Sequence, residues 1–405
     1  MKRPSFRSWR AVRAILLGNS LALLLPPAPA AETAPPAAPE VTAGVVYEKV
    51  SPPSGRATEI GCFGTSPESP DGRRIVYVAF DWQREEKGAN FSKGALYLCD
   101  ADLTTPVKLK DLTRVRWHDG AMQIWLDNDT LAYMDYLPEK KYYVTYVIRK
   151  NGDPVAGPFE GGLGHGDTPN GSVLMVVDKK QYPNGSNLGS NGLYLYKNGA
   201  VTQVVNTEKD LGPLKGRLKG GDVPADWVIY HPQLSTKGNH ISIRLDTAKG
   251  VENLVTCKLD GTDVRLFETV KKPLHQQWYD DTTLFAHQRG GGPDQLKGQR
   301  WDRDGKHIET LSGPGNHLGM SPDRKYLVSE NIYKSDPVVM KLYRTGNTEP
   351  LAVLMNVPAG SIWNRSTHVN PAFSRDGKHV YFNKPVDGMP QVNRIDLSSL
   401  TRGQN

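Results

Sequence analysis

Six of the ten histidines in this chain recur at one place in a repeating unit, and they carry its chemical signal. Their spacings are 47, 66, 44, 42 and 51 residues, and each histidine lies just upstream of a short apolar run. An imidazole can exchange a proton near neutral pH or ligate a metal. If the repeat aims them at one place, several could meet one ligand. The six are His118, His165, His231, His275, His317 and His368.

The elements that must position these histidines are short strands. After residue 43 the sequence consists of β-type runs broken by Gly, Pro, Asn and Asp, without the spacing of a long amphipathic helix. Units of roughly 40 to 50 residues with several strands each are typical of β-propeller blades. We therefore predict an all-β, seven-bladed β-propeller over residues 44–400. The units are expected to start near Glu59, Thr113, Gly162, Asp222, Lys272, Gly315 and Arg365.

Two further expectations follow from aligning the units. Residues 43–50, AGVVYEKV, are predicted to supply the outer strand that closes the ring on the last blade. Five of the six histidines lie an odd number of residues before the aromatic, Met or Leu residue at the turn. On extended strands their side chains would therefore point the same way. His165 has an even offset and is the exception, and the first unit offers only Thr65 at this place.

The N-terminus predicts export. Residues 1–31 combine a basic segment, an apolar run and small residues suited to cleavage, as in a signal peptide, and residues 32–43 are a Pro/Ala linker. Losing the five basic residues of the signal reduces the formal net charge from +7 to about +2. We therefore expect a secreted or periplasmic monomer with no nucleic-acid partner and no membrane insertion.

Cysteine usage leaves two alternatives open. Cys62 and Cys99 fall in the same predicted blade and could pair in an oxidising compartment, which would leave Cys257 free. Equally, all three could be small buried side chains.

The recurring histidines also have a structural interpretation, in which each caps the same turn of its blade. The residues around them differ greatly between units, however, and strand ends that face the channel are common ligand sites in propellers. We therefore favour a ligand site in the channel. His240, His307 and His379 lie next to turns and are expected at the surface.

Three segments within about residues 270–385 resemble seven-bladed propeller polysaccharide lyases: HQQWYDDTTLFAH, GNHLGMSPD and RSTHVNPAFSRDG. Oligogalacturonate lyase is the most similar, ulvan lyases are related in architecture, and the turns also resemble periplasmic propellers of the translocation-protein type. The resemblance implies that His275 is a general base and that His317 and His368 ligate a divalent metal (Mn, Ca or Zn). Arg365 and Asn370 stand where the family has its other two ligands. Asn can offer an oxygen to a hard cation, whereas Arg would replace the charge of the cation.

β-Elimination of a uronate glycoside suits this set of residues. The reaction removes the C5 proton beside the carboxylate and expels the sugar oxygen on C4, so it needs a base and a cation that neutralises the carboxylate. We predict a lyase acting on acidic, uronate-containing oligosaccharides. Its catalytic residues would be His275, Arg244 and His231, its metal ligands His317 and His368, and its substrate-binding residues Arg365, Arg289, His118, Asn370 and Trp278.

Other functions remain possible from the sequence. Tyr279, Trp278 and Trp363 could supply an acid or a sugar-stacking face, or could be core residues. A non-catalytic periplasmic propeller that binds a protein or a glycan is the main alternative. A peptidase is disfavoured because the chain lacks a Gly-x-Ser-x-Gly nucleophile motif.

Overall fold

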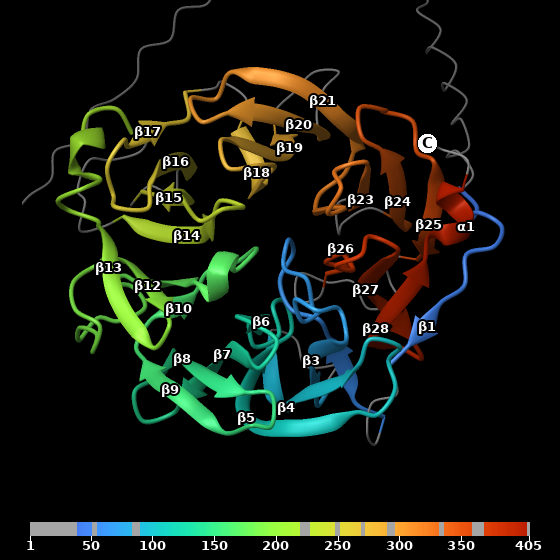
Figure 1. The fold of residues 1–405 in the computed structure, drawn as a ribbon, viewed down its shortest axis with the longest axis horizontal. Helices are drawn as coiled ribbons and strands as arrows, with labels where there is room; N and C mark the ends of the chain where they lie inside the picture. The colour runs from blue at the N-terminus through green and yellow to red at the C-terminus, as the bar shows by residue number, and fades with distance from the viewer. Residues whose placement is uncertain are drawn as a thin grey trace, which may run out of the picture. The chain divides into compact units, whose positions relative to one another are not determined.

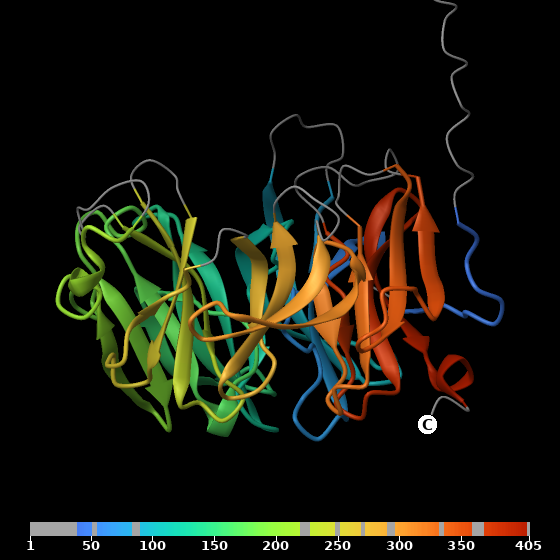
Figure 2. The ribbon, with the colours of Figure 1, turned by 90° about the horizontal axis from the view of Figure 1, so that it is seen from above.

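Seven four-stranded antiparallel sheets are arranged around a common axis (Figure 1). The computed structural model describes residues 39–50, 55–82, 90–218, 227–247, 252–268, 272–289, 296–331, 336–358 and 368–402, excluding the side chains of residues 272, 274 and 289. Consecutive blades are neighbours in the ring, and the strands run across the thickness of the disc (Figure 2). The described chain is therefore a seven-bladed β-propeller, as the sequence predicted.

The strands have the following bounds. The first blade is β2 (Ala57–Glu59), β3 (Arg74–Phe80), β4 (Phe91–Asp100) and β5 (Val107–Arg116), and the second is β6 (Ile124–Trp125), β7 (Thr130–Leu137), β8 (Tyr142–Arg149) and β9 (Pro154–Phe159). The third blade is β10 (Gly162–Leu163), β11 (Val173–Val177), β12 (Gly192–Lys197) and β13 (Ala200–Asn206), the fourth is β14 (Val228–Leu234), β15 (His240–Asp246), β16 (Glu252–Lys258) and β17 (Arg265–Leu266), and the fifth is β18 (Lys272–Trp278), β19 (Thr283–Arg289), β20 (Lys297–Asp302) and β21 (His307–Pro314). The sixth blade is β22 (Leu318–Met320), β23 (Tyr326–Glu330), β24 (Val338–Arg344) and β25 (Ala352–Val357), and the seventh is β26 (Ala372–Phe373), β27 (His379–Val386), β28 (Met389–Asp396) and β1 (Glu48–Lys49). A short helix, α1 (Ser398–Thr401), follows the last blade.

The ring is closed by the N-terminal strand β1, as predicted. Glu48 is paired with Arg394 of β28 and Lys49 with Asn393, so β1 is the outer strand of the seventh blade. The Arg394 guanidinium also forms an ion pair with the Glu48 carboxylate. Joining strands from the two ends of the chain in one sheet ties the first blade to the last and covers the outer edge of β28.

One predicted boundary is wrong. Thr113 lies inside β5, the outer strand of the first blade, and the second blade begins at Ile124. The charged and polar side chains of VKLKDLTRVR are typical of an edge strand that faces solvent on one side. Because such a polar stretch is similar to the beginning of a new repeat unit, the sequence analysis placed a boundary inside it. The expected starts at Asp222 and Arg365 lie outside the described residues, as do the predicted signal peptide and most of the linker.

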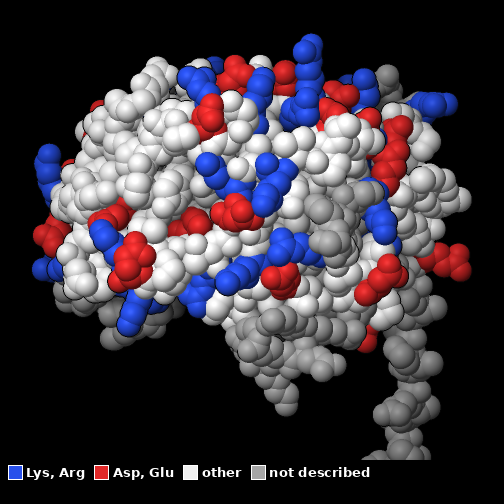
Figure 3. All heavy atoms as spheres, turned by 90° about the horizontal axis from the view of Figure 1, so that it is seen from below, with Lys and Arg blue, Asp and Glu red and all other residues white. Residues whose placement is uncertain are grey.

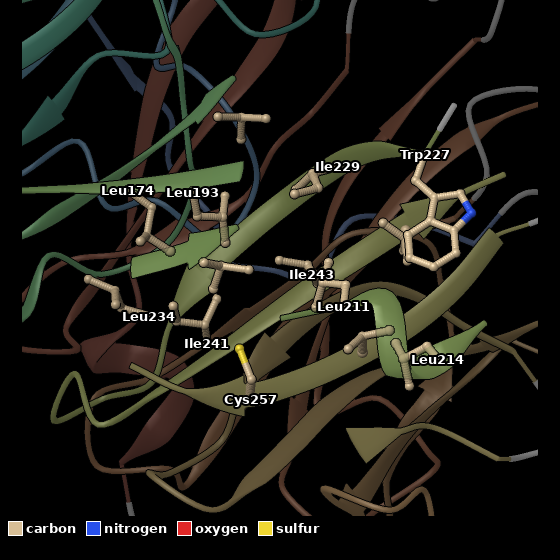
Figure 4. Packing of buried hydrophobic residues seen from close by; sticks show 14 of the residues in the cluster. Leu174, Leu193, Leu211, Leu214, Trp227, Ile229, Leu234, Ile241, Ile243 and Cys257 are labelled. Atoms are coloured by element: carbon tan, nitrogen blue, oxygen red, sulfur yellow. The ribbon is translucent and has the colours of Figure 1, made fainter. Parts of the chain in front are cut away.

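Apolar clusters between neighbouring blades hold the ring together. Middle strands such as RIVYVAF of β3 are buried along nearly their whole length because the sheet has a neighbour on each face. Figure 4 shows one cluster, where Leu174 and Leu193 of the third blade meet Ile229, Ile241 and Ile243 of the fourth. Each fully buried aliphatic side chain contributes roughly 1.5–3 kcal/mol to stability.

All three cysteines are buried and unpaired. Cys99 lies in the core of the first blade with Ile75 and Tyr77, whereas Cys62 lies near the axis, beside the Asp119 carboxylate. Of the two alternatives, the structure therefore favours three small buried side chains over a disulfide between Cys62 and Cys99.

The outer surface carries charges of both signs. On the face shown in Figure 3, basic and acidic side chains are interspersed. Among the residues that the structure describes, no helix has the length and apolar character needed to cross a membrane.

Candidate functional site

The six recurring histidines form one cluster at the propeller axis. Each comes from a different blade, and neighbouring rings meet edge to face or tilted. This confirms that distant stretches of chain aim their imidazoles at a shared centre, His165 included. The centroid distances are 4.0 Å for His118–His368, 4.8 Å for His368–His317, 4.3 Å for His317–His275, 6.1 Å for His275–His231 and 4.6 Å for His231–His165.

The first blade supplies a phenylalanine where the other six supply histidine. Phe63 is only 2% exposed, and its ring touches four of the histidines. Thr65, the residue expected at this place, instead accepts a hydrogen bond from the Gly166 amide. The sequence signal that could have found Phe63 is its position, because it lies only two residues before Thr65 in the first unit. The centroid distances are 5.5 Å to His165, 5.3 Å to His231, 4.7 Å to His275 and 5.2 Å to His317.

Irregular backbone, rather than extended strand, turns the histidines inward. His231 and His275 have φ values of 47° and 57°, in the left-handed region. Each lies where the pairing shifts register, between Tyr230 and Gln233 in β14 and at the equivalent place in β18. Such β-bulges re-aim a side chain at a cost of about 1 kcal/mol or more. The alternation of side chains along an extended strand therefore does not determine where these histidines point, and it wrongly set His165 apart from the other five.

Burial keeps five of the clustered imidazoles neutral, those of His165, His231, His275, His317 and His368. It lowers the pKa of His165 to about 4 and that of His317 to about 3. The pKa values of His231, His275 and His368 are also well below the usual value, mainly through burial and then through the neighbouring histidines. A neutral imidazole has a free lone pair, so these rings can accept a hydrogen bond at neutral pH, and the lowered pKa makes them weaker bases than a free histidine.

Hydrogen bonds fix the tautomer of His275 and of a further buried histidine, His287. The Nδ1 atom of His275 lies 3.3 Å from the Asn316 carbonyl oxygen, and Nδ1 of His287 lies 2.7 Å from the same oxygen. Because a carbonyl only accepts, both Nδ1 atoms carry the proton, and Nε2 of His275 keeps its lone pair. The sequence analysis did not single out His287, which is fully buried behind the cluster.

Three other ring nitrogens lack a partner. The Nδ1 atoms of His118, His165 and His231 are buried and form no hydrogen bond with any other residue that the structure describes. Buried polar atoms are almost always satisfied by protein, water or a ligand. Three orphaned nitrogens within one cluster therefore point to a place where a ligand or water binds.

The predicted metal ligands His317 and His368 face each other, with Nε2 of the first 3.3 Å from Nδ1 of the second. Nδ1 of His317 is hydrogen-bonded to the buried Glu330 carboxyl group, whose pKa burial raises to about 8. Within the described ranges, no three His, Cys, Asp or Glu side chains are grouped so that they could hold a metal. Two facing nitrogens do not make a closed site, so the described donors do not fit a resident cation.

The side chain of Asn370 forms hydrogen bonds that link blades of the ring. Its side-chain amide donates to the carbonyl oxygens of Gly61 at 2.9 Å and His118 at 3.2 Å, and the residue is 1% exposed. It therefore ties the seventh blade to the first two, with its donors already used. Arg365, which stands at the other departure from the family pattern, lies outside the described residues.

A pocket of about 600 Å³ opens beside the cluster, between the first four blades. His165 and His231 form part of its wall, together with an ion pair in which Arg116 Nη2 lies 2.8 Å from an Asp119 oxygen. His118 Nε2 is 3.4 Å from the other oxygen of Asp119. Burial alone would raise the pKa of Asp119, but the charges of His118 and Arg116 lower it to about 2. Tyrosines, basic residues and apolar side chains line the rest of the pocket.

Arg244, a predicted catalytic residue, lies close to this wall. Its guanidinium covers the face of Tyr230, a pocket residue, at 4.8 Å from the ring centroid, and it forms ion pairs with Asp246 at 3.2 Å and Glu252 at 3.8 Å. Its positive charge contributes to the lowered pKa of His231. The structure thus brings Arg244 next to the histidines, as expected, with acidic partners that were not foreseen.

The remaining predicted site residues lie elsewhere. Trp278 is buried in the fifth blade, donates its indole N–H to the Gln233 carbonyl and lines a separate cavity of about 300 Å³ at the turn-bearing ends of the strands. The Arg300 guanidinium covers the ring of Tyr279, with its central carbon 3.9 Å from the ring centroid. The side chain of Arg289 and all of Trp363 are outside the described residues.

The sequence analysis missed most of the pocket. Arg116, Tyr143 and Tyr230 line it beside the histidines but belong to no repeated pattern. Of the three turn histidines, His307 is exposed, and His240 and His379 are partly exposed.

Fold and site together define the chain as a seven-bladed β-propeller with a histidine-lined axis and an adjoining basic pocket. No protein-family model matches the chain, and no curated protein matches it. Among solved structures it is similar to oligogalacturonate lyase from Vibrio parahaemolyticus, at TM-score 0.55 and 12% identity, covering 87% of this chain and 97% of that one. It is also similar to an oligogalacturonate lyase in complex with manganese, at TM-score 0.57 and 13% identity, covering 88% and 98%.

A different enzyme class shares the fold. Prolyl oligopeptidase B from Galerina marginata matches at TM-score 0.52 and 11% identity, over 85% of this chain but only 50% of that one. Similarity at these identities shows the propeller fold alone, so the function must be argued from the site.

Proposed function

We propose that this protein is an exported lyase that cleaves uronate-containing oligosaccharides by β-elimination. The observation that carries the proposal is the cluster of neutral imidazoles beside Arg244, Arg116 and a basic, tyrosine-rich pocket. The similarity of the fold to that of oligogalacturonate lyases also supports the proposal. Export rests on the N-terminal sequence.

In the proposed reaction, a uronate carboxylate binds near Arg244 and Arg116, which favour the negative charge that builds up on the carboxylate. Nε2 of His275, whose ring lies behind the pocket residue His231 at a centroid distance of 6.1 Å, takes the proton from C5 of a sugar that reaches past His231. The electron pair left on C5 forms the C4–C5 double bond, and the C4–oxygen bond breaks. The leaving oxygen takes a proton from Tyr143 or Tyr230, whose rings line the pocket. Burial raises the pKa of Tyr143 to about 12, so its hydroxyl carries its proton at neutral pH.

His231 has a separate role in this scheme. It lines the pocket with a half-buried ring and an unpartnered Nδ1 atom, so it can contact the substrate directly. We assign it to substrate binding beside the carboxylate, where a bound anion would also raise its pKa and let it act as a hydrogen-bond donor.

The divalent metal implied by the resemblance enters no step of this scheme. The neighbouring structure is a manganese complex, but the two facing nitrogens of His317 and His368 lack a third described ligand. The guanidinium groups of Arg116 and Arg244 supply positive charge at the site.

The test is a substrate screen with the purified full chain. Galacturonate, glucuronate and iduronate oligomers are mixed with the protein, and the ultraviolet absorbance of the unsaturated product is followed. A rising signal with one of them is expected. A well-folded protein that gives no signal with any of them contradicts the lyase.

A non-catalytic propeller that binds a glycan is the second candidate. One observation favours it: Phe63 fills the centre of the histidine cluster, so the rings have a packing role as well. In that case the uronate oligomers would bind without product, and His275→Ala would change stability but no rate.

A further inference from the structure

A second cavity, of about 300 Å³, lies at the turn-bearing ends of the inner strands. It takes Gln233 and Leu234 from β14, whereas the pocket beside the histidines takes residues 229–232 of the same strand. Residues from six of the seven blades line it, and none of them lines the histidine pocket. The cavity is therefore a separate space, further along the inner strands than the site of the proposed reaction.

Two partly exposed guanidinium groups line this cavity. Arg324 belongs to the turn between β22 and β23, and Arg375 to the turn between β26 and β27. Within the described ranges, the Arg324 guanidinium has no ion pair. Its burial lowers its pKa, and the charge of Asp167 acts in the opposite direction. Because a guanidinium stays protonated at neutral pH, Arg324 places an uncompensated, half-buried charge in the wall.

Arg375 is only partly satisfied by its neighbours. Its Nη1 atom lies 3.4 Å from an oxygen of Asp167, and Nη2 donates to the Glu68 carbonyl oxygen at 3.3 Å. Its Nε atom is buried and has no hydrogen-bond partner in the part of the chain that the structure describes. Buried donors are almost always satisfied, so this atom points to a ligand or water. The two arginines and Asp167 give the cavity lining a net formal charge of +1.

The inner wall of the cavity is apolar and aromatic. Trp278, Phe285 and Phe373 line it, and each is at most 5% exposed. An apolar cavity of roughly 150 Å³ holds one benzene molecule. The larger volume of this cavity therefore has room for one ring and a polar substituent. Ligand sites typically combine such an apolar wall with a few polar groups that fix the orientation of the ligand.

We infer that this cavity binds a small aromatic carboxylate. Its ring lies against the three aromatic side chains, and its carboxylate pairs with Arg324 and Arg375. A guanidinium offers parallel N–H donors to the two oxygens of a carboxylate, and the net charge of the lining suits a single negative charge. The ligand is thus distinct from the uronate of the proposed lyase reaction, and the site does not depend on that reaction.

Calorimetric titration of the full chain with benzoate tests the site. Benzyl alcohol offers the ring without the charge, acetate offers the charge without the ring, and inorganic phosphate is a different anion. Benzoate should bind at least about tenfold more tightly than each of the three, because it alone buries a ring and forms charge-assisted hydrogen bonds. Added salt should weaken the binding of benzoate.

Two variants at the cavity should act in opposite directions. Arg324→Gln breaks no ion pair among the described residues, and it should weaken benzoate binding about tenfold or more while benzyl alcohol binds as before. Asp167→Asn removes a like charge and releases Arg375, so it should tighten benzoate binding about twofold to fivefold. Arg149→Gln, which changes an exposed side chain on β8, is the matched control and should change neither.

Three results overturn the site. They are no binding of benzoate at millimolar concentration, benzyl alcohol that binds as tightly as benzoate, and unchanged benzoate binding in Arg324→Gln. His231→Ala separates the two pockets, because benzoate binding should persist in this variant. Loss of benzoate binding in His231→Ala but not in Arg324→Gln would place the anion among the histidines and contradict the assignment.

Discussion

The Nδ1 atom of His275 lies 3.3 Å from the carbonyl oxygen of Asn316, and this contact leaves Nε2 as the basic nitrogen of the ring. If His275 is the base, His275→Ala should lower kcat by about 100-fold to 10,000-fold with little change in KM. His307→Ala, which removes an exposed histidine on β21, is the control and should keep full activity.

His231 provides the contrast to His275, because it lines the pocket. His231→Ala should raise KM more than it lowers kcat, as expected for a residue that binds the substrate. Steady-state kinetics on both variants separates the roles. If His231→Ala abolishes kcat while His275→Ala retains it, the two assignments must be exchanged.

Phe63 is expected to tune the histidines by excluding water from their centre. Phe63→Ala should admit water, weaken the desolvation of His165, His231, His275 and His317, and raise their pKa values towards the usual value. NMR titration of the imidazoles measures this directly, and the acidic limb of the kcat/KM profile should move to higher pH. The variant should also lose about 3–5 kcal/mol of stability.

Phe63→Leu is the control for the cavity, because it keeps an apolar side chain in the centre. It should retain titration close to that of the wild type. Unchanged imidazole titration in Phe63→Ala would show that the remaining side chains alone keep the histidines dry.

Buried neutral histidines also make stability depend on pH. The folded-state pKa of His165 is about 4, below the usual value of 6.5. Between these two values the unfolded chain binds the proton and the folded chain does not. The free energy of unfolding should therefore fall as the pH drops from 6.5 towards 4, by up to about 1.4 kcal/mol per pH unit for each such histidine.

Chemical denaturation of the wild type and of His165→Asn at pH 7.5, 6.5, 5.5 and 4.5 checks this contribution. The variant should show a shallower loss of stability below pH 6.5. Glu330 acts in the opposite direction, because its pKa is raised to about 8 and its contribution is lost as the pH rises. The two proteins are therefore compared at each pH. Parallel curves would contradict the assignment to His165.

The fold could be predicted from the sequence because each blade is made of strands that are local in sequence. The meeting of the histidines could be predicted for the same reason, since one place in each unit maps to one radius of the ring. Phe63 was missed because the first unit has no histidine at this place. His165 was set apart from the other five histidines because the alternation of an extended strand was applied at the axis, where the bulged, left-handed backbone of His231 and His275 shows that it does not hold. The pocket residues Arg116 and Tyr230 escaped because they meet only through the arrangement of neighbouring blades.

The donor set at His317 and His368 leads to a last expectation about metals. Their nitrogens lie 3.3 Å apart, but no third His, Cys, Asp or Glu completes a metal site within the described residues. With only two such ligands, a divalent cation should bind weakly and exchange with solvent. Elemental analysis of the purified protein should find well under one divalent ion per chain, and activity should survive chelation and dialysis. A contrary result would be a loss of activity on chelation that added manganese restores in the wild type but not in His317→Ala. It would show that a ligand outside the described residues completes the site.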